Sequence, residues 1–294
     1  MSTTRPGSPI VVGVDGSESA LGAVRWAARE ARRRRVPLRA VTAFEWTHDH
    51  ALGQPGLGTR YREIMLDAAR DRLTSAVEVA EREQPGLEVQ SQLVAGYPIP
   101  VLIEEARRAL MVVIGDRGLG GVTGLLLGSV AVALGARAEC PTVVVRGDEP
   151  EPTAPVVVGV DGSPTSEAAL AFAFEAASLR QAALVAVHTW WDLFVDPALA
   201  PILDWDAIEE DERQLLAERL AGWGEKYPDV PVQRVVTREH ASRALVERSR
   251  KAQLVVVGSR GRGGVAGLLL GSVSHAVLHR AHCPVAVVRP QPAS

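Results

Sequence analysis

The stretch LVVVGSRG, residues 254–261, decides the fold of the second half of the chain because a run of four apolar residues is stopped there by a glycine. A short apolar run rich in β-branched residues is typical of a buried parallel strand that ends in a loop. Further on, Gly271 and Ser272 open a new apolar helical segment. Glycines let a ligand approach the backbone, and the free N–H groups of a helix N-terminus attract phosphate. The stretch therefore predicts a strand, a glycine loop and a phosphate-binding helix N-terminus.

The same construction occurs earlier, as MVVIGDRG over residues 111–118, followed by Gly128 and Ser129. Each motif position of this first copy lies 143 residues before its counterpart, as 258 minus 115 and 271 minus 128 both show. A chain of 294 residues also suggests about two domains by length alone. The chain is therefore a duplication, and we expect a domain at residues 1–147, a linker at 148–154 and a domain at 155–294.

In both copies the glycine motif follows a strand, and it reads Gly-x-x-Gly, nine residues, then Gly-Ser. It is not a Walker loop, because no Gly-Lys-Ser/Thr brings a lysine to the phosphates, and Gly-x-Gly-x-x-Gly does not follow either first strand. The spacing resembles the signature of the ATP-binding subclass of the universal stress protein family, and the resemblance covers nearly the whole chain. It implies ATP as the ligand of both halves, with Mg²⁺ as a candidate companion ion.

Strand and helix patterns alternate along each half, which favours an α/β fold with parallel sheets and right-handed crossovers. The expected strands are 10–15, 38–44, 87–94, 110–115 and 142–146, then 156–161, 184–189, 232–237, 254–258 and 285–289. Four helices are expected at 60–82, 98–108, 205–226 and 241–250. Four more are expected to begin at Ser17, Ser129, Ser163-Pro164 and Ser272. Glycine- and proline-rich loops are expected at 46–59 and around Pro197 and Pro201. The prediction is two tandem Rossmann-like domains, each a five-stranded parallel sheet flanked by helices.

The family resemblance adds expectations about assembly. In the family the last strands of two domains pair with each other, so residues 142–146 and 285–289 are expected to pair within one chain. That pairing would relate the two domains by a pseudo-two-fold axis. A homodimer of tandems is a further expectation.

Composition bounds the class of protein. Hydrophobic residues make up 47% and charged residues 23%, and no apolar run approaches the roughly 18 residues of a membrane span. The net charge of −3 gives no general attraction to nucleic acid. Cys140 and Cys283 stand at equivalent positions, and the start of the chain shows no signal peptide. We expect a soluble, cytoplasmic protein with two structural thiols and neither nucleic acid nor membrane as a partner.

Asp15 and Asp161 end their first strands within the repeated sequence VGVDGS. An aspartate before glycine commonly bonds its own turn, whereas a carboxylate at this rim could also accept from a ribose hydroxyl or an adenine amine. Repetition and the resemblance favour the nucleotide role, and the resemblance also assigns Ala43 and Thr189 to the adenine pocket. The expected binding residues of the first half are Gly13, Val14, Asp15, Ala43, Gly115, Arg117, Gly118, Gly128, Ser129 and Val130. Those of the second half are Gly159, Val160, Asp161, Thr189, Gly258, Arg260, Gly261, Gly271, Ser272, Val273 and Ser274.

The chain offers no clear catalytic group. Arg117 and Arg260 could neutralise phosphate charge or be ordinary surface arginines. His279, His282 and Cys283 have a metal-like spacing, which we interpret as helix-end packing. Neither a Gly-x-Ser-x-Gly elbow nor a duplicated acid–base pair is present. We therefore expect no metal ligand, no catalytic residue and at most very slow ATP hydrolysis.

The leading hypothesis is an ATP-binding regulator of stress response or dormancy that acts through nucleotide-dependent conformation or an unknown protein partner. The alternatives are a stress scaffold that binds no nucleotide and a slow ATPase or nucleotidyl-transfer enzyme on the same fold. The two sites are expected to be unequal, with the second tighter. Asp116 stands where the second copy has Ser259, and Ala131 stands where it has Ser274. An acidic side chain beside a polyphosphate and a lost hydroxyl would both weaken the first site.

Overall fold

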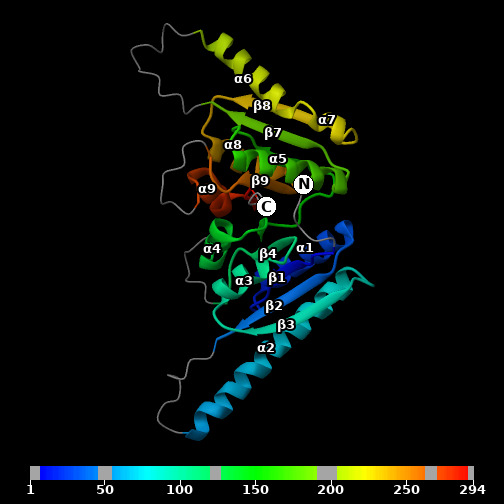
Figure 1. The fold of residues 1–294 in the computed structure, drawn as a ribbon, viewed down its shortest axis with the longest axis vertical. Helices are drawn as coiled ribbons and strands as arrows, with labels where there is room; N and C mark the ends of the chain where they lie inside the picture. The colour runs from blue at the N-terminus through cyan, green and yellow to red at the C-terminus, as the bar shows by residue number, and fades with distance from the viewer. Residues whose placement is uncertain (1–6, 46–54, 120–126, 191–203, 262–269, 291–294) are drawn as a thin grey trace. The chain divides into compact units, whose positions relative to one another are not determined.

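The computed structural model describes residues 7–45, 55–119, 127–190, 204–261 and 270–290 (Figure 1). Of residues 55–59 and 61 it describes the backbone alone. The chain divides into two compact units, one up to Arg146 and one from Gly147 to Pro290. Within the described residues, none of the helices combines the length and apolar character needed to cross a membrane.

The first unit is a five-stranded parallel sheet in the order β3-β2-β1-β4-β5. Its strands are β1 (Ile10–Gly13), β2 (Leu38–Phe44), β3 (Val89–Ala95), β4 (Met111–Gly115) and β5 (Thr142–Val145). Its helices are α1 (Glu18–Arg34), α2 (Pro55–Glu83), α3 (Pro98–Ala106) and α4 (Ser129–Arg137). From β1 the chain proceeds to β2 and β3, and then returns past β1 to β4 and β5. Because the crossovers are right-handed, this reversal places α1 and α2 on one face of the sheet and α3 and α4 on the other.

The second unit repeats this topology in the order β10-β9-β6-β7-β8, again with parallel pairs. Its strands are β6 (Val156–Gly159), β7 (Leu184–Thr189), β8 (Val232–Thr237), β9 (Leu254–Gly258) and β10 (Val285–Val288). Its helices are α5 (Pro164–Arg180), α6 (Trp205–Leu220), α7 (Trp223–Lys226), α8 (Ala241–Arg248), the 3₁₀ turn η3 (Ser249–Lys251) and α9 (Ser272–Arg280). The predicted fold class of two tandem α/β domains with five parallel strands each is confirmed.

The registers of the two sheets define equivalent residues. Ile10 pairs with Leu38 in the first unit, and Val156 pairs with Leu184 in the second. The central strands are buried on both faces, which explains why they read as continuous apolar runs. The serine that precedes each first helix caps it: Ser17 Oγ accepts from Ala20 N at 3.1 Å, and Ser163 Oγ accepts from Ser166 N at 3.2 Å.

Some predicted boundaries are wrong. Helix α2 begins at Pro55, so residues 55–59 are helical rather than loop, because proline is tolerated in a first turn and each glycine costs a long helix only about 1 kcal/mol. Residues 46–54 and the segment around Pro197 and Pro201 lie outside the described residues. The helix expected at 205–226 is interrupted after Leu220, where Gly222 adopts φ 80° and starts α7. Helix α8 ends at Arg248 and gives way to η3. The pairing of the last strands and the pseudo-two-fold axis stay predictions.

Candidate functional site

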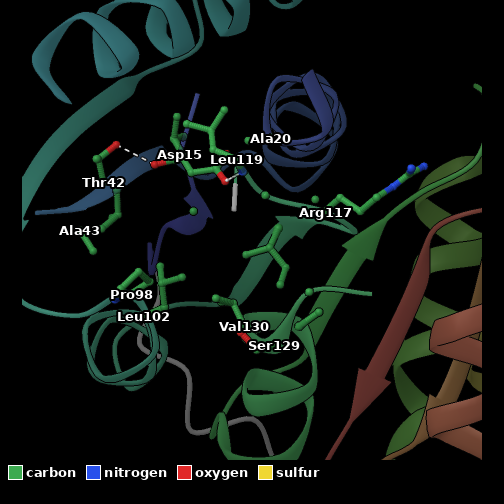
Figure 2. A pocket seen from close by; sticks show the side chains of 18 of the residues that line it. Asp15, Ala20, Thr42, Ala43, Pro98, Leu102, Arg117, Leu119, Ser129 and Val130 are labelled. Carbon is green, nitrogen blue, oxygen red and sulfur yellow. Dashed lines mark hydrogen bonds between the residues drawn. The ribbon is translucent and has the colours of Figure 1, made fainter. Parts of the chain in front are cut away.

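A cavity of about 580 Å³ lies at the carboxyl ends of the strands of the first unit (Figure 2). This edge is where open parallel sheets bind ligands. The ends of β1 and β2, the start of α3, the glycine loop after β4 and the start of α4 all contribute to its wall. It is lined by all ten residues that the sequence predicts for this half, namely Gly13, Val14, Asp15, Ala43, Gly115, Arg117, Gly118, Gly128, Ser129 and Val130.

The N-terminus of α4 forms one wall of the cavity. Ser129 and Val130 occupy the first turn, whose N–H groups have no acceptor within the helix. Gly128 precedes them with ordinary extended angles, and its N–H donates to Asp116 O at 2.9 Å. A partial positive charge therefore faces the cavity from this side. Pro98 and Leu102 of α3, with Ala43, give the same cavity an apolar part (Figure 2).

The carboxylate of Asp15 joins the β1–α1 turn to the glycine loop. Its Oδ1 accepts from Ser17 N and its Oδ2 from Leu119 N, both at 2.9 Å. The turn role is therefore real, and a bond to the loop accompanies it. Each carboxylate oxygen has a second lone pair, which leaves acceptor capacity towards the cavity that Asp15 lines. In the second unit Asp161 Oδ1 accepts in the same way from Ser163 N at 2.9 Å.

Three of the motif glycines are required by close contacts within the protein. A Cβ at Gly118 would lie 2.5 Å from Asp15 Oδ2, and a Cβ at Gly261 would lie 2.6 Å from Asp161 Oδ2. A Cβ at Gly115 would lie 2.7 Å from the carbonyl oxygen of Ser19 in α1. These glycines let the loop close over the aspartate and let the first helix approach β4. The sequence had suggested close approach of a ligand instead.

The two arginines of the glycine loops face away from the ligand edge or lie exposed. The Arg117 side chain is 70% exposed, and its Nε lies 3.5 Å from Asp116 Oδ2. Figure 2 shows its guanidinium extending away from the other labelled side chains. Arg260 is exposed, and its carbonyl accepts from Thr165 Oγ1. The contribution of Arg117 to the cavity wall is therefore mainly that of its backbone.

A cation that the sequence analysis missed lines the same cavity. Arg72 reaches it from α2, far along the chain from every motif residue. The repeat pattern could not reveal it, because the corresponding position of the second half is not basic. Only the packing of α2 over the β1–α1 turn brings it to the cavity.

The structure removes both reasons given for a tighter second site. Asp116 is buried, and its Oδ1 accepts from Ser19 Oγ at 2.7 Å, so the carboxylate is directed at α1. Ser274 is also buried, and its hydroxyl lies 2.9 Å from Gly271 O and 3.1 Å from Ser259 O. A hydroxyl has one proton, which here serves the backbone of the loop.

The predicted residues of the second unit gather at the corresponding edge of its sheet. Gly159 ends β6, and Val160 and Asp161 follow it. Thr189 ends β7 in the register position of Ala43. Gly258 ends β9, and Arg260 and Gly261 follow it. The remaining four, Gly271, Ser272, Val273 and Ser274, form the start of α9.

One residue at this edge, His188, was not predicted. Its Nδ1 lies 2.7 Å from Val160 O, and its Nε2 lies 2.7 Å from Glu212 Oε2 of α6. Because a carbonyl only accepts, Nδ1 is the donor, and one proton lies between Nε2 and the carboxylate. The equivalent residue of the first unit, Thr42, donates to Val14 O at 2.9 Å.

The histidines at the end of α9 make contacts with each other and with the neighbouring 3₁₀ turn. The rings of His275 and His279 lie 4.4 Å apart, and His282 N donates to Ser249 Oγ at 2.9 Å. In the part of the chain that the structure describes, no three His, Cys, Asp or Glu side chains are grouped so as to hold a metal ion.

Comparison with known proteins identifies the family to which this chain belongs. The universal stress protein family model matches the chain twice, over residues 8–146 and 153–289. Universal stress protein Rv2005c of Mycobacterium tuberculosis is 46% identical over 301 residues, which cover 98% of this chain and 99% of the relative. Universal stress protein Rv2623 of the same organism is 42% identical over 310 residues, with 98% and 99% covered. A crystal structure of a universal stress protein from Archaeoglobus fulgidus covers 97% of both chains with a TM-score of 0.71 at 20% identity, which supports the fold. The family predicted from the glycine spacing is confirmed.

Proposed function

Because the chain belongs to the universal stress protein family, we propose that each half binds an adenine nucleotide, with ATP and a companion Mg²⁺ as the ligand. The protein then acts as a regulator of stress response or dormancy through nucleotide-dependent conformation or partners. One observation carries the proposal: the ten residues expected from the glycine motif converge on one cavity that joins a helix N-terminus, a carboxylate and an apolar recess.

The parts of the cavity suit the parts of a nucleotide. The N–H groups at the start of α4 and the backbone of Gly118 would hold phosphates. Asp15 would accept from the ribose, and Pro98, Leu102 and Ala43 would cover the base. Residues that line this described cavity include neither lysine nor histidine, and Asp15 is held by two backbone donors. Any turnover is therefore expected far below the ~10 s⁻¹ typical of enzymes.

The test begins with the full chain as purified. Bound nucleotide is extracted and identified by chromatography, and the emptied protein is titrated calorimetrically with ATP and GTP, with and without Mg²⁺. We expect an adenine nucleotide in the extract and ATP binding at both halves. Absence of nucleotide together with absence of ATP binding would favour the nucleotide-independent scaffold. Turnover near ~10 s⁻¹ would favour an enzyme.

The proposal includes the setting in which the protein works. We propose action in the cytoplasm and assembly of the tandems as homodimers. Cys140 and Cys283 are buried thiols outside any disulfide, which suits a reducing compartment. Light scattering of the purified chain, with and without ATP, measures the assembly directly, and a monomer under both conditions would refute the dimer.

A further inference from the structure

Arg72 is placed in the cavity wall by close packing on the β1–α1 turn. A Cβ at Gly16 would lie 2.9 Å from Arg72 Cγ, 3.1 Å from Cδ and 3.3 Å from Nε, so only glycine leaves room for this side chain. Gly16 also has φ +91°, which favours glycine independently. The arginine is half-buried, and among the described residues it makes neither an ion pair nor a hydrogen bond. Its charge is therefore available to a ligand in the cavity.

Arg72 and the α4 N-terminus approach the cavity from opposite faces of the sheet. Helices α1 and α2 pack together on one face, and α3 and α4 pack together on the other. The cavity thus has two positions that favour an anion, one at the start of α4 and one beside Gly16. A nucleotide whose phosphates are all on the 5′ side would occupy the first position alone.

We propose that the first unit selects adenine nucleotides that carry a second phosphate on a ribose hydroxyl, and that Arg72 binds this phosphate. The inference rests on the proposed function, because it takes Asp15 as the ribose residue. Gly16, on which Arg72 packs, directly follows Asp15, so the Arg72 side chain passes next to the turn that carries the residue that would hold the ribose. An arginine near a ribose-binding carboxylate is a known way to accommodate a ribose phosphate, and the guanidinium can bind phosphate through two parallel hydrogen bonds.

The second unit supplies a matched control. Val89 of β3 and Val232 of β8 are equivalent by register, since they pair with Leu38 and Leu184. The same separation of 143 residues (232 minus 89, 215 minus 72) makes Leu215 of α6 the counterpart of Arg72. The second unit therefore has an apolar side chain where the first has a cation, and it should not discriminate in this way.

The experiment compares four ligands by calorimetry on the full chain: 5′-AMP, 5′-ADP, adenosine 3′,5′-bisphosphate and adenosine 2′,5′-bisphosphate. The two bisphosphates distinguish the ribose positions, and 5′-ADP controls for added charge. We expect one bisphosphate to bind one of the two sites about tenfold more tightly than 5′-AMP does. At the same site 5′-ADP should show no such gain in affinity over 5′-AMP. Arg72→Leu should abolish the gain, so that this bisphosphate binds no more tightly than 5′-AMP, and Arg72→Lys should restore part of it.

The reverse substitution sharpens the assignment. Leu215→Arg should create a second site with the same preference, because it copies the first unit at an equivalent position. Equal affinities of 5′-ADP and both bisphosphates in the unmodified chain would overturn the inference, as would Arg72→Leu weakening 5′-AMP as much as the bisphosphates. If no 5′-nucleotide binds at all, the proposed function itself fails, so the two failures are distinguishable. Thermal unfolding of each variant verifies that the fold is retained.

Discussion

The two units share topology, register and glycine motif, yet they differ where one helix meets the ligand edge of the sheet. Both need a donor for a buried carbonyl at the end of the first strand, and they use different side chains. At three equivalent positions the first unit has Thr42, Ala69 and Arg72, and the second has His188, Glu212 and Leu215. The motif residues on the strands and loops are therefore shared by the two units, whereas the side chains on α2 and α6, the helices after the second strand of each unit, differ.

A second difference lies inside the first helix of each unit. Glu30 of α1 is fully buried, and Arg34 Nε lies 2.6 Å from its Oε1. The equivalent position of α5 is Ala176, also fully buried, while Arg180 is retained and donates to Ala176 O. Equivalent folds thus have a buried charge in one unit and an apolar residue in the other. Strand pattern and helix capping therefore fix the architecture, whereas the charge of buried helix positions varies between the units.

The largest expected effect concerns this buried carboxylate. Glu30→Ala removes the buried carboxylate that Arg34 Nε contacts, where the Arg34 side chain is only 4% exposed, and should destabilise the first unit by about 3–5 kcal/mol. Glu104→Ala is the control, because its pair with Arg107 is exposed and should contribute no more than about 1 kcal/mol. Urea unfolding measures both, and similar losses in the two variants would contradict the argument.

The second-largest expected effect is on ATP binding, which one added methyl group should weaken in one unit and leave intact in the other. Gly118→Ala and Gly261→Ala should each displace the aspartate of their own unit and weaken ATP binding there by at least about tenfold. Calorimetric titration should then show one remaining class of sites. Gly22→Ala and Gly224→Ala are controls, since a Cβ at either position would have no neighbour within 4 Å among the described residues beyond its own helix. Loss of both classes from one variant would show that the sites are coupled.

A smaller loss of stability is expected when the side chains that donate to the strand-end carbonyls, His188 and Thr42, lose their interactions. Glu212→Ala leaves His188 Nε2 without its partner at a position only 4% exposed, and should destabilise the second unit by about 1–3 kcal/mol. Thr42→Val removes a single neutral hydrogen bond from the first unit and should remove about 1 kcal/mol. Glu210→Ala, on the exposed side of α6, is the control. If Glu212→Ala behaves like Glu210→Ala in urea unfolding, the pair has no structural role.

The smallest expected effect is a pH dependence in the first unit. Burial raises the pKa of the Cys140 thiol from 9.0 to about 12. The folded protein therefore keeps this proton where the unfolded chain loses it, so the stability it contributes is complete below about pH 9 and falls as the pH rises towards 12. Between about pH 8 and pH 10 the loss should be about 1 kcal/mol more than in Cys140→Ala. The free energy of unfolding is measured against pH for the unmodified protein and for Cys140→Ala. The same dependence on pH in both would contradict the prediction.

The sequence by itself determined the duplication, the parallel sheets and the place of the cavity. Buried strands such as 111–115 and 254–258 are apolar on both faces, so their pattern is local and survives without tertiary information. Parallel strands end at one edge, which is why glycine loops that are far apart from Asp15 in sequence could be placed beside it. The ten predicted residues of the first half accordingly line one cavity.

Tertiary structure decided what depends on side-chain direction and on helix packing. Asp116 could face the cavity or α1, and only the position of Ser19 shows that it faces α1. Arg72 and Glu212, which contacts His188, lie on helices that reach the edge after a long connection, so no spacing rule connects them to the motif. The start of α2 at Pro55 was likewise hidden, because glycine composition favours a loop and packing along a long helix can override it. Local sequence therefore fixed the scaffold, whereas contacts between distant elements fixed the charges around the site.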